Sequence, residues 1–151
     1  MLTVGKKAPA FTLPDQEGKK VSLKDFKGKK LVLYFYPKDD TPGCTTEACS
    51  FRDNMRLVTS KKTNIVGISI DSVQSHKRFQ TKYALPFPLL SDESKKIVKL
   101  YGVWKEKNMY GKKYMGIERT TFIIDENGVI IHIFIKVKVD GHIDKVLEVI
   151  S

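Results

Sequence analysis

Residues 31–49 read LVLYFYPKDDTPGCTTEAC, and both cysteines of the 151-residue chain lie in this stretch. Its first six residues form an apolar run of the length of a buried β-strand. The apolar spacing that follows Cys44 indicates a helix, so Cys44 lies where a strand leads into a helix N-terminus. Unpaired backbone N–H groups and the helix dipole favour a thiolate at such a position. We therefore expect Cys44 to be a reactive thiol that faces inward.

The second cysteine has a different position on the same predicted helix. Cys49 comes five residues after Cys44, about 140° around the helix. In an intact helix their Cα atoms lie roughly 8.6 Å apart, whereas a disulfide spans at most about 7 Å. The two thiols can therefore bond only if the first turns unwind. Cys44 shares its stripe with four later apolar residues: Ala48, Phe51, Met55 and Val58.

This stretch resembles the peroxiredoxin family, and closely its peroxiredoxin Q subfamily, also called bacterioferritin comigratory protein. The family pattern Pro-x-x-x-Thr-x-x-Cys is met by Pro37, Thr41 and Cys44. The subfamily string Tyr-Pro-Lys-Asp-x-Thr-Pro-Gly-Cys-Thr-x-Glu-x-Cys is met without a gap over residues 36–49. The resemblance continues outside this string, for example at residues 119–122, and covers nearly the whole chain.

The resemblance implies a thiol peroxidase without a cofactor, acting on hydrogen peroxide and organic hydroperoxides. Cys44 would be the peroxidatic nucleophile that becomes a sulfenic acid. Cys49 would be the resolving thiol, which gives a Cys44–Cys49 disulfide. Thr41 and Arg119 match the family's peroxide-binding threonine and second-site arginine. Thioredoxin or a similar dithiol protein would recycle the disulfide, and subfamily members are often monomers.

Three further residues of the stretch have expected supporting parts. Pro37 lacks an N–H donor and is expected to shield the thiolate from water. Gly43 leaves its backbone N–H open to close approach by a substrate oxygen. Glu47 would either cap the first helical turn or tune the thiol, and the sequence gives it no firm role.

Each site residue also has an ordinary structural interpretation. Without its motif, Cys44 could equally be an inert buried cysteine. Thr41 could be a capping threonine, and the two readings are compatible. Arg119 would by default be a surface arginine, and Cys49 a passive thiol. Only the resemblance connects Arg119 to Cys44.

The apolar runs and turn signals predict an α/β fold in a single domain over residues 1–151. The order β-α-β-α-β-α-β-β-α after an N-terminal β-hairpin predicts a thioredoxin-like fold, with a central mixed sheet flanked by helices. The polar segment 104–115 is expected to be a loop. The expected strands lie near residues 10–13, 20–23, 31–36, 64–70, 89–90, 120–124 and 129–137. The expected helices begin near residues 44, 72 and 92, and a last one covers 143–150.

The charge pattern argues against nucleic-acid binding. The net charge is +10, from 27 basic and 17 acidic residues. The lysines form scattered pairs, with no block of five like charges, and only four of the basic residues are arginines. We therefore expect a solvated basic surface and no nucleic-acid site.

Other absences limit the remaining functions. No apolar run approaches the roughly 18 residues of a membrane span, and the N-terminus has no apolar segment typical of a secretory signal. Two cysteines in such a chain suggest a reducing, cytoplasmic setting. The sequence has neither zinc-ligand spacing nor a nucleotide-binding glycine motif, so no metal and no cofactor are expected.

Three alternatives to a peroxidase remain open at this point. A thioredoxin-type disulfide oxidoreductase usually has Cys-x-x-Cys, whereas here four residues separate the cysteines. A binding module would use the basic surface. A redox sensor would pass its oxidation to a partner protein through the same two thiols.

Overall fold

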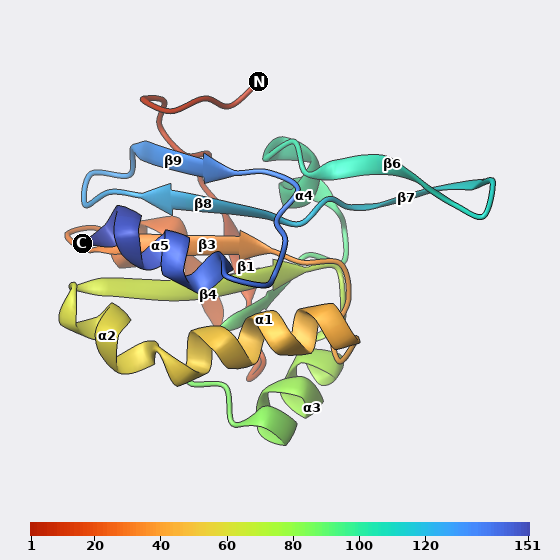
Figure 1. Cartoon of the computed structure of the whole chain (residues 1–151), viewed down its shortest axis with the longest axis horizontal. Coiled ribbons are helices and arrows are strands. Elements are labelled where there is room, and N and C mark those ends of the chain that lie inside the picture. Colours follow the sequence, from red (N-terminus) through yellow and green to blue (C-terminus); the bar gives the residue numbers. More distant parts are fainter.

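The computed structural model describes residues 1–151, and its centre is a five-stranded mixed sheet in the order β5-β4-β3-β8-β9 (Figure 1). The central strand β3 (Lys30–Phe35) pairs in parallel with β4 (Thr63–Ser69) and antiparallel with β8 (Thr120–Ile124). The edges are β5 (Leu89–Ser91) and β9 (Ile130–Phe134). The mixed sheet predicted from the sequence is confirmed.

Both faces of this sheet are covered, which is why β3 is apolar and buried at every position after Lys30. Val32 and Tyr34 of β3 belong to a core cluster shared with α1, α2, α3 and α5, whereas Leu31 and Leu33 face the opposite cluster. This alternation is the two-residue period of a strand. The helices are α1 (Pro42–Asp53), α2 (Met55–Ser60), α3 (Val73–Tyr83), α4 (Lys96–Leu100) and α5 (His142–Ile150).

The expected N-terminal hairpin is present, and its buried residues pack on the sheet face that carries Leu31 and Leu33. It consists of β1 (Thr12–Pro14) and β2 (Lys20–Ser22), followed by the 3₁₀ helix η1 (Leu23–Phe26). Its buried residues pack with α4 residues in one cluster. None of the helices has the length and apolar character that a bilayer span requires.

The helix that follows Cys44 is shorter than its apolar stripe predicted. It ends at Asp53, and Asn54 (φ −108°, ψ 12°) separates α1 from α2. The Asn54 side chain donates to the Ser50 carbonyl at 2.9 Å, which is the competition with backbone bonding that makes asparagine a poor helix residue. Met55 and Val58 therefore belong to a second helix.

The segment 104–117 is a β-hairpin, and the prediction of a loop was wrong. Strands β6 (Trp104–Met109) and β7 (Lys112–Ile117) pair antiparallel and project from the body of the molecule (Figure 1). The turn residues Tyr110 and Gly111 both have positive φ, 54° and 80°, as two-residue hairpin turns require. Most of the hairpin is exposed, so it lacks the apolar alternation that marks a half-buried strand.

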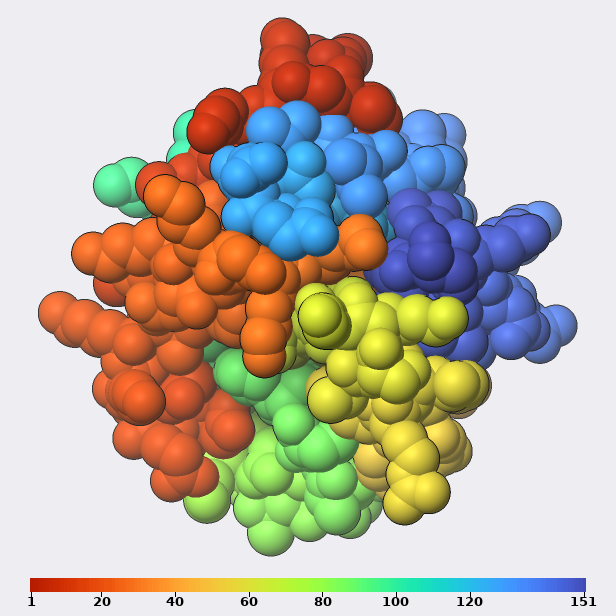
Figure 2. Space-filling view, turned by 90° about the vertical axis from the view of Figure 1, so that its left-hand side faces the viewer, coloured from red at the N-terminus to blue at the C-terminus, as the bar shows by residue number.

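The two ends of the sheet differ. Cys44 follows the carboxyl end of β3, where the chain enters α1. Figure 2 looks onto the other end, where the start of β3 (orange), the β8–β9 turn (blue) and α2 (yellow) adjoin. The candidate site therefore lies at the carboxyl end of β3.

Candidate active site

Cys44 is the third residue of α1 and is almost completely buried, with 2% of its surface exposed. The helix begins at Pro42, a favoured first residue because its missing N–H would have no partner there, and Thr41 is the N-cap with extended backbone. The Arg119 Nη2 donates to the Cys44 Sγ at 3.4 Å. The guanidinium therefore places a positive charge and a hydrogen-bond donor directly beside the sulfur. The inward orientation expected for Cys44 is confirmed.

Arg119 reaches the sulfur because of the strand topology. It precedes β8, whose first residue, Thr120, is paired with Phe35 at the carboxyl end of β3. The chain turns from that end of β3 toward Cys44, so Arg119 and Cys44 meet although 75 residues separate them. Sequence periodicity could not identify Arg119, whereas the family resemblance did.

Glu47, for which no firm role was predicted, is bonded to Arg119 beside Cys44. It lies three residues after Cys44 on the same side of α1, and only 2% of its surface is exposed. Its Oε1 accepts a bond from the Arg119 Nη1 at 2.6 Å, whereas its Oε2 has no partner. Burial raises the pKa of Glu47 to about 7, against the opposing effect of the Arg119 charge. The one available signal was a glutamate on an otherwise apolar stripe.

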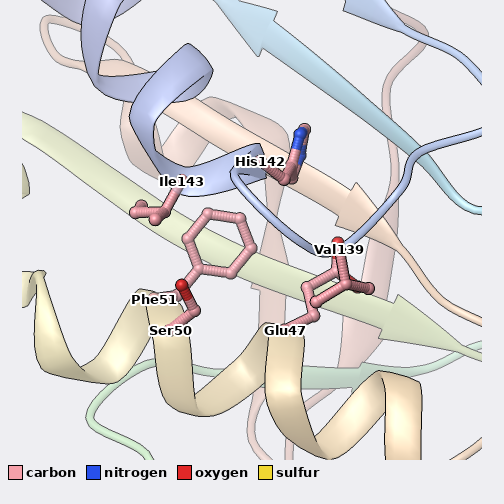
Figure 3. A pocket seen from close by; sticks show the side chains of 6 residues that line it. All are labelled: Glu47, Ser50, Phe51, Val139, His142 and Ile143. Atoms are coloured by element: carbon pink, nitrogen blue, oxygen red, sulfur yellow. The ribbon is translucent and has the colours of Figure 1, made fainter.

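A small pocket beside Glu47 lies between α1 and the start of α5 (Figure 3). His142 is buried in its wall, 2.9 Å from the Thr121 hydroxyl through Nε2. Burial, with the charges of Lys145 and Arg119, lowers the pKa of His142 to about 4, so its imidazole is neutral at neutral pH. The lining residues are Glu47, Ser50, Phe51, Val139, His142 and Ile143.

Thr41 is at the N-cap but makes no capping bond through its side chain. Its hydroxyl donates to the carbonyl of Lys38 at 2.8 Å. The hydroxyl hydrogen is therefore engaged within the loop. The oxygen keeps lone pairs that can accept a bond from a peroxide O–H.

Gly43 and Pro37 lie on either side of the loop. A Cβ on Gly43 would be 3.1 Å from the Arg119 Nη2, tighter than side-chain contacts normally are. The glycine therefore makes room for the arginine beside Cys44, a reason that the sequence did not suggest. Pro37 is half-buried directly after β3, and its shielding of the thiolate stays a prediction.

Cys49 is partly buried, and both cysteines are free thiols within one continuous helix. This is the reduced, fully folded arrangement. Since the intact helix keeps the two Cα atoms too far apart for a disulfide, any bond between these sulfurs requires α1 to unwind through its first two turns.

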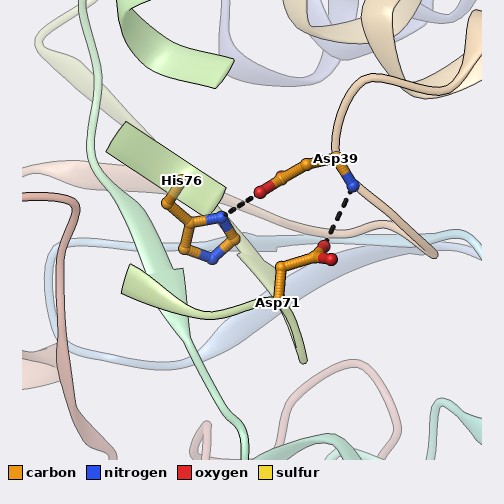
Figure 4. A group of neighbouring side chains, drawn as sticks. All are labelled: Asp39, Asp71 and His76. Atoms are coloured by element: carbon orange, nitrogen blue, oxygen red, sulfur yellow. Dashed lines mark hydrogen bonds and ion pairs between the residues drawn. The ribbon is translucent and has the colours of Figure 1, made fainter. Parts of the chain in front are cut away.

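One cluster has the spacing of a metal site. Possible ligand atoms of Asp39, Asp71 and His76 all lie within 4.8 Å of one another. Figure 4 shows that they are already bonded: His76 Nδ1 lies 2.7 Å from Asp39 Oδ2, and the Asp39 N–H donates to Asp71 Oδ2 at 2.9 Å. A cation would have to break these bonds, so the three side chains form a hydrogen-bonded cluster and not a metal site.

A buried thiol at the start of a helix, bonded to an arginine on a thioredoxin-like sheet, defines a thiol-dependent peroxidase. The protein is of this class. The chain belongs to the AhpC/TSA family, whose profile matches residues 4–133.

Relatives agree with this assignment over the full length. The chain is 58% identical over 146 residues to a putative peroxiredoxin Bcp of Coxiella burnetii, with 97% of each chain covered. It is 48% identical over 150 residues to peroxiredoxin Bcp of Bacillus subtilis, covering 99% of this chain and 96% of that one. The expected subfamily is therefore confirmed, and the alternative of a thioredoxin-type oxidoreductase is set aside.

Solved structures agree as well. The bacterioferritin comigratory protein of Xanthomonas campestris superposes with a TM-score of 0.88 at 42% identity, covering 93% of this chain and 89% of that one. A PrxQ mutant of Xylella fastidiosa gives a TM-score of 0.93 at 36% identity, covering 98% and 94%. The thioredoxin-like fold predicted from the sequence is confirmed.

Proposed function

We propose that Cys44 is the peroxidatic cysteine of this peroxidase. Its thiolate attacks one peroxide oxygen, the O–O bond breaks, and Cys44 becomes a sulfenic acid. The second oxygen leaves as water or an alcohol after taking up a proton. Arg119 stabilises first the thiolate and then the charge that develops on the leaving oxygen. The N–H groups of Gly43 and Cys44, in the first turn of α1, have no intrahelical partner and can donate to the same oxygen.

The observation that carries this proposal is the bond from Arg119 Nη2 to the buried Cys44 Sγ at 3.4 Å. The test is peroxide consumption by Cys44→Ser, which we expect to be abolished, beside Cys49→Ser, which we expect to complete a single turnover. Full activity of Cys44→Ser would overturn the assignment.

We propose that Cys49 resolves the sulfenic acid. The Cys49 sulfur attacks the Cys44 sulfur, the S–O bond breaks, and a Cys44–Cys49 disulfide and water result. Intact mass after one equivalent of hydrogen peroxide provides the test: loss of two hydrogens supports resolution by Cys49. Gain of one oxygen would leave Cys44 as the only reacting thiol. If Cys49 resolves the sulfenic acid, Cys44 of the Cys49→Ser variant should oxidise further to the sulfinic acid.

The remaining parts of the proposal concern the setting of the reaction. We propose that thioredoxin or a similar dithiol protein reduces the disulfide, and that residues 1–151 act as one monomeric domain in the cytoplasm. The presence of only two cysteines in a chain of 151 residues supports a reducing compartment. A thioredoxin-coupled assay and sedimentation of both redox forms test these points, and turnover with small thiols alone, or a dimer, would overturn them.

A further inference from the structure

The loop that leads to Cys44 is joined to the rest of the molecule by a buried ion pair. Asp39 lies five residues before Cys44, and 7% of its surface is exposed. His76, on α3, is completely buried. The Asp39 Oδ2 lies 2.7 Å from the His76 Nδ1 (Figure 4). This pair connects the active-site loop to a helix that contributes nothing to the thiol chemistry.

His76 is bonded through both ring nitrogens. The His76 Nε2 is 3.0 Å from the backbone carbonyl of Leu90 in β5. A carbonyl oxygen can only accept, so this nitrogen carries a hydrogen. The Nδ1 shares one hydrogen with the Asp39 Oδ2. The ring therefore joins the active-site loop to β5 as well as to its own helix.

Asp39 is bonded as a carboxylate should be. Besides His76, it accepts bonds from the Tyr36 hydroxyl at 2.6 Å and the Ser75 hydroxyl at 2.8 Å. Both oxygens of the Asp39 carboxyl group are therefore bonded, and three side chains hold the group in place.

The groups around the Asp39–His76 pair include no side chain of positive charge that could replace His76. Asp71 contributes a second carboxylate, which accepts bonds from the Ser69 hydroxyl at 2.6 Å and from the Asp39 N–H. The Tyr36 oxygen, 3.5 Å from His76 Nδ1, completes the surroundings. No salt bridge other than that with His76 involves Asp39 or Asp71. Removing His76 would therefore leave a buried carboxylate unpaired, which is strongly unfavourable.

We propose that the Asp39–His76 pair sets the balance between the folded active site and the unwound form in which Cys44 reaches Cys49. Asp39 and His76 act as positioning residues: they hold residues 37–43 against α3, and the peroxide-binding arrangement depends on that placement. This proposal rests on the resolving role given to Cys49 above. Weakening the pair favours the unwound form, so it slows the reaction with peroxide and speeds disulfide formation.

The chain offers a matched control in the next residue. Asp40 is exposed and also binds α3, through Lys82 Nζ at 2.8 Å and the Tyr83 hydroxyl at 2.9 Å. Asp40→Asn removes a loop-to-helix ion pair of the same kind at the surface, where such pairs contribute little. Asp39→Asn and His76→Gln remove the buried pair.

The first experiment measures how each protein partitions its sulfenic acid. Reduced protein receives increasing hydrogen peroxide, is quenched with acid, and its disulfide and sulfinic acid products are counted by intact mass. We expect the ratio of disulfide to sulfinic acid to rise at least tenfold in Asp39→Asn and His76→Gln, and to stay within twofold in Asp40→Asn. An unchanged ratio in a folded His76→Gln protein would overturn the proposal.

The equilibrium should shift in the same direction. A tenfold bias toward the unwound form makes the potential of the Cys44–Cys49 couple about 30 mV more negative. If the two buried variants fail to fold, Ser75→Ala removes only one donor to Asp39 and should raise the product ratio about twofold to threefold. An unchanged ratio in Ser75→Ala would then count against the proposal.

Two measurements do not depend on Cys49. In the Cys49→Ser background, iodoacetamide reaches the buried Cys44 only when the loop opens, so His76→Gln should raise the alkylation rate about tenfold and Asp40→Asn should leave it unchanged. Nitrogen NMR of the wild-type protein should show a hydrogen bond at the His76 Nδ1 that is lost in Asp39→Asn. An Nδ1 signal that is unchanged in Asp39→Asn would overturn the proposal, whereas a wild-type protein that forms no disulfide would overturn only the role of Cys49.

Discussion

Two buried ion pairs lie on opposite sides of Cys44, and they differ in how completely they are bonded. In the Asp39–His76 pair, both ring nitrogens and both carboxylate oxygens have partners. In the Glu47–Arg119 pair, the Glu47 Oε2 is buried without a partner, and Arg119 also donates to the reacting sulfur. A fully bonded network fixes a conformation, whereas an unpaired buried group is open to titration. This difference agrees with the proposed roles, in which the first pair positions the loop and the second takes part in the chemistry.

Loss of Arg119 should have the largest effect, because it breaks the second pair and removes the cation from the sulfur. We expect Arg119→Ala to lower kcat/KM for hydrogen peroxide by about 10²–10³-fold, the usual cost of one preorganised donor to a developing oxyanion. Stopped-flow kinetics measure it. Arg56→Ala, at an exposed position on α2, is the control, and activity within twofold of wild type in Arg119→Ala would contradict the role of Arg119.

Glu47→Gln tests whether the unpaired oxygen titrates. The pKa of Glu47 is raised from 4.5 to about 7 by burial, so the folded state binds the proton more tightly than the unfolded state. The stability it contributes is present below pH 4.5 and is lost as the pH rises to 7, on the order of 3 kcal/mol. Urea unfolding measures the free energy of unfolding across this pH range. The loss of stability with rising pH should be absent in Glu47→Gln. It should persist in the control Glu148→Gln, on the exposed side of α5.

His142→Asn should remove a dependence of stability on pH that has the opposite sign to that of Glu47. The pKa of His142 is lowered from 6.5 to about 4, so acid protonates the unfolded state first and stability is lost as the pH falls from 6.5 toward 4. We expect up to about 2 kcal/mol from this group. In wild type the two slopes partly cancel, so Glu47→Gln alone should gain stability from pH 4 to 6.5. The double variant should be flat, and a remaining slope there would mean that another group is responsible.

We expect the smallest effect from the hydroxyl groups of two stacked tyrosines, Tyr34 in β3 and Tyr36 directly after it. Their ring centroids are 5.4 Å apart. The Tyr36 hydroxyl donates to Asp39, whereas the buried Tyr34 hydroxyl has no partner. Tyr36→Phe should lower the free energy of unfolding by about 1–2 kcal/mol, and Tyr34→Phe should change it by less than about 0.5 kcal/mol. Equal losses in chemical denaturation would show that the Asp39 bond contributes nothing particular.

The sequence was most informative for helices that bury one face and for strands that are buried on both faces. The strand, loop and helix of residues 31–53 followed from an apolar run and helical spacing, and the sheet followed from similar runs. The β6–β7 hairpin was missed because its residues are mostly exposed and so show no alternation. The end of α1 was missed because Asn54 is a local competitor for backbone bonds, and apolar spacing continues across it.

The site was predicted only in part, for a reason that concerns distance along the chain. Cys44 and Thr41 lie together in the sequence, and a motif marks them. Glu47 and Arg119 are 72 residues apart, and Asp39 and His76 are 37 apart. A lone glutamate or histidine is usually assigned to the surface or left without a role, because the partner that allows its burial is brought to it only by the fold.

The break at Asn54 also affects how quickly the enzyme recovers between turnovers. Unwinding as far as Cys49 leaves the last turn of α1, and Phe51 holds that turn in the core against Tyr34, with ring centroids 4.8 Å apart. In the proposed cycle, residues 42–49 add to an existing turn after reduction, so the slow nucleation of a helix is avoided and growth takes about nanoseconds per residue. We therefore expect that refolding of α1 does not limit the rate of that cycle.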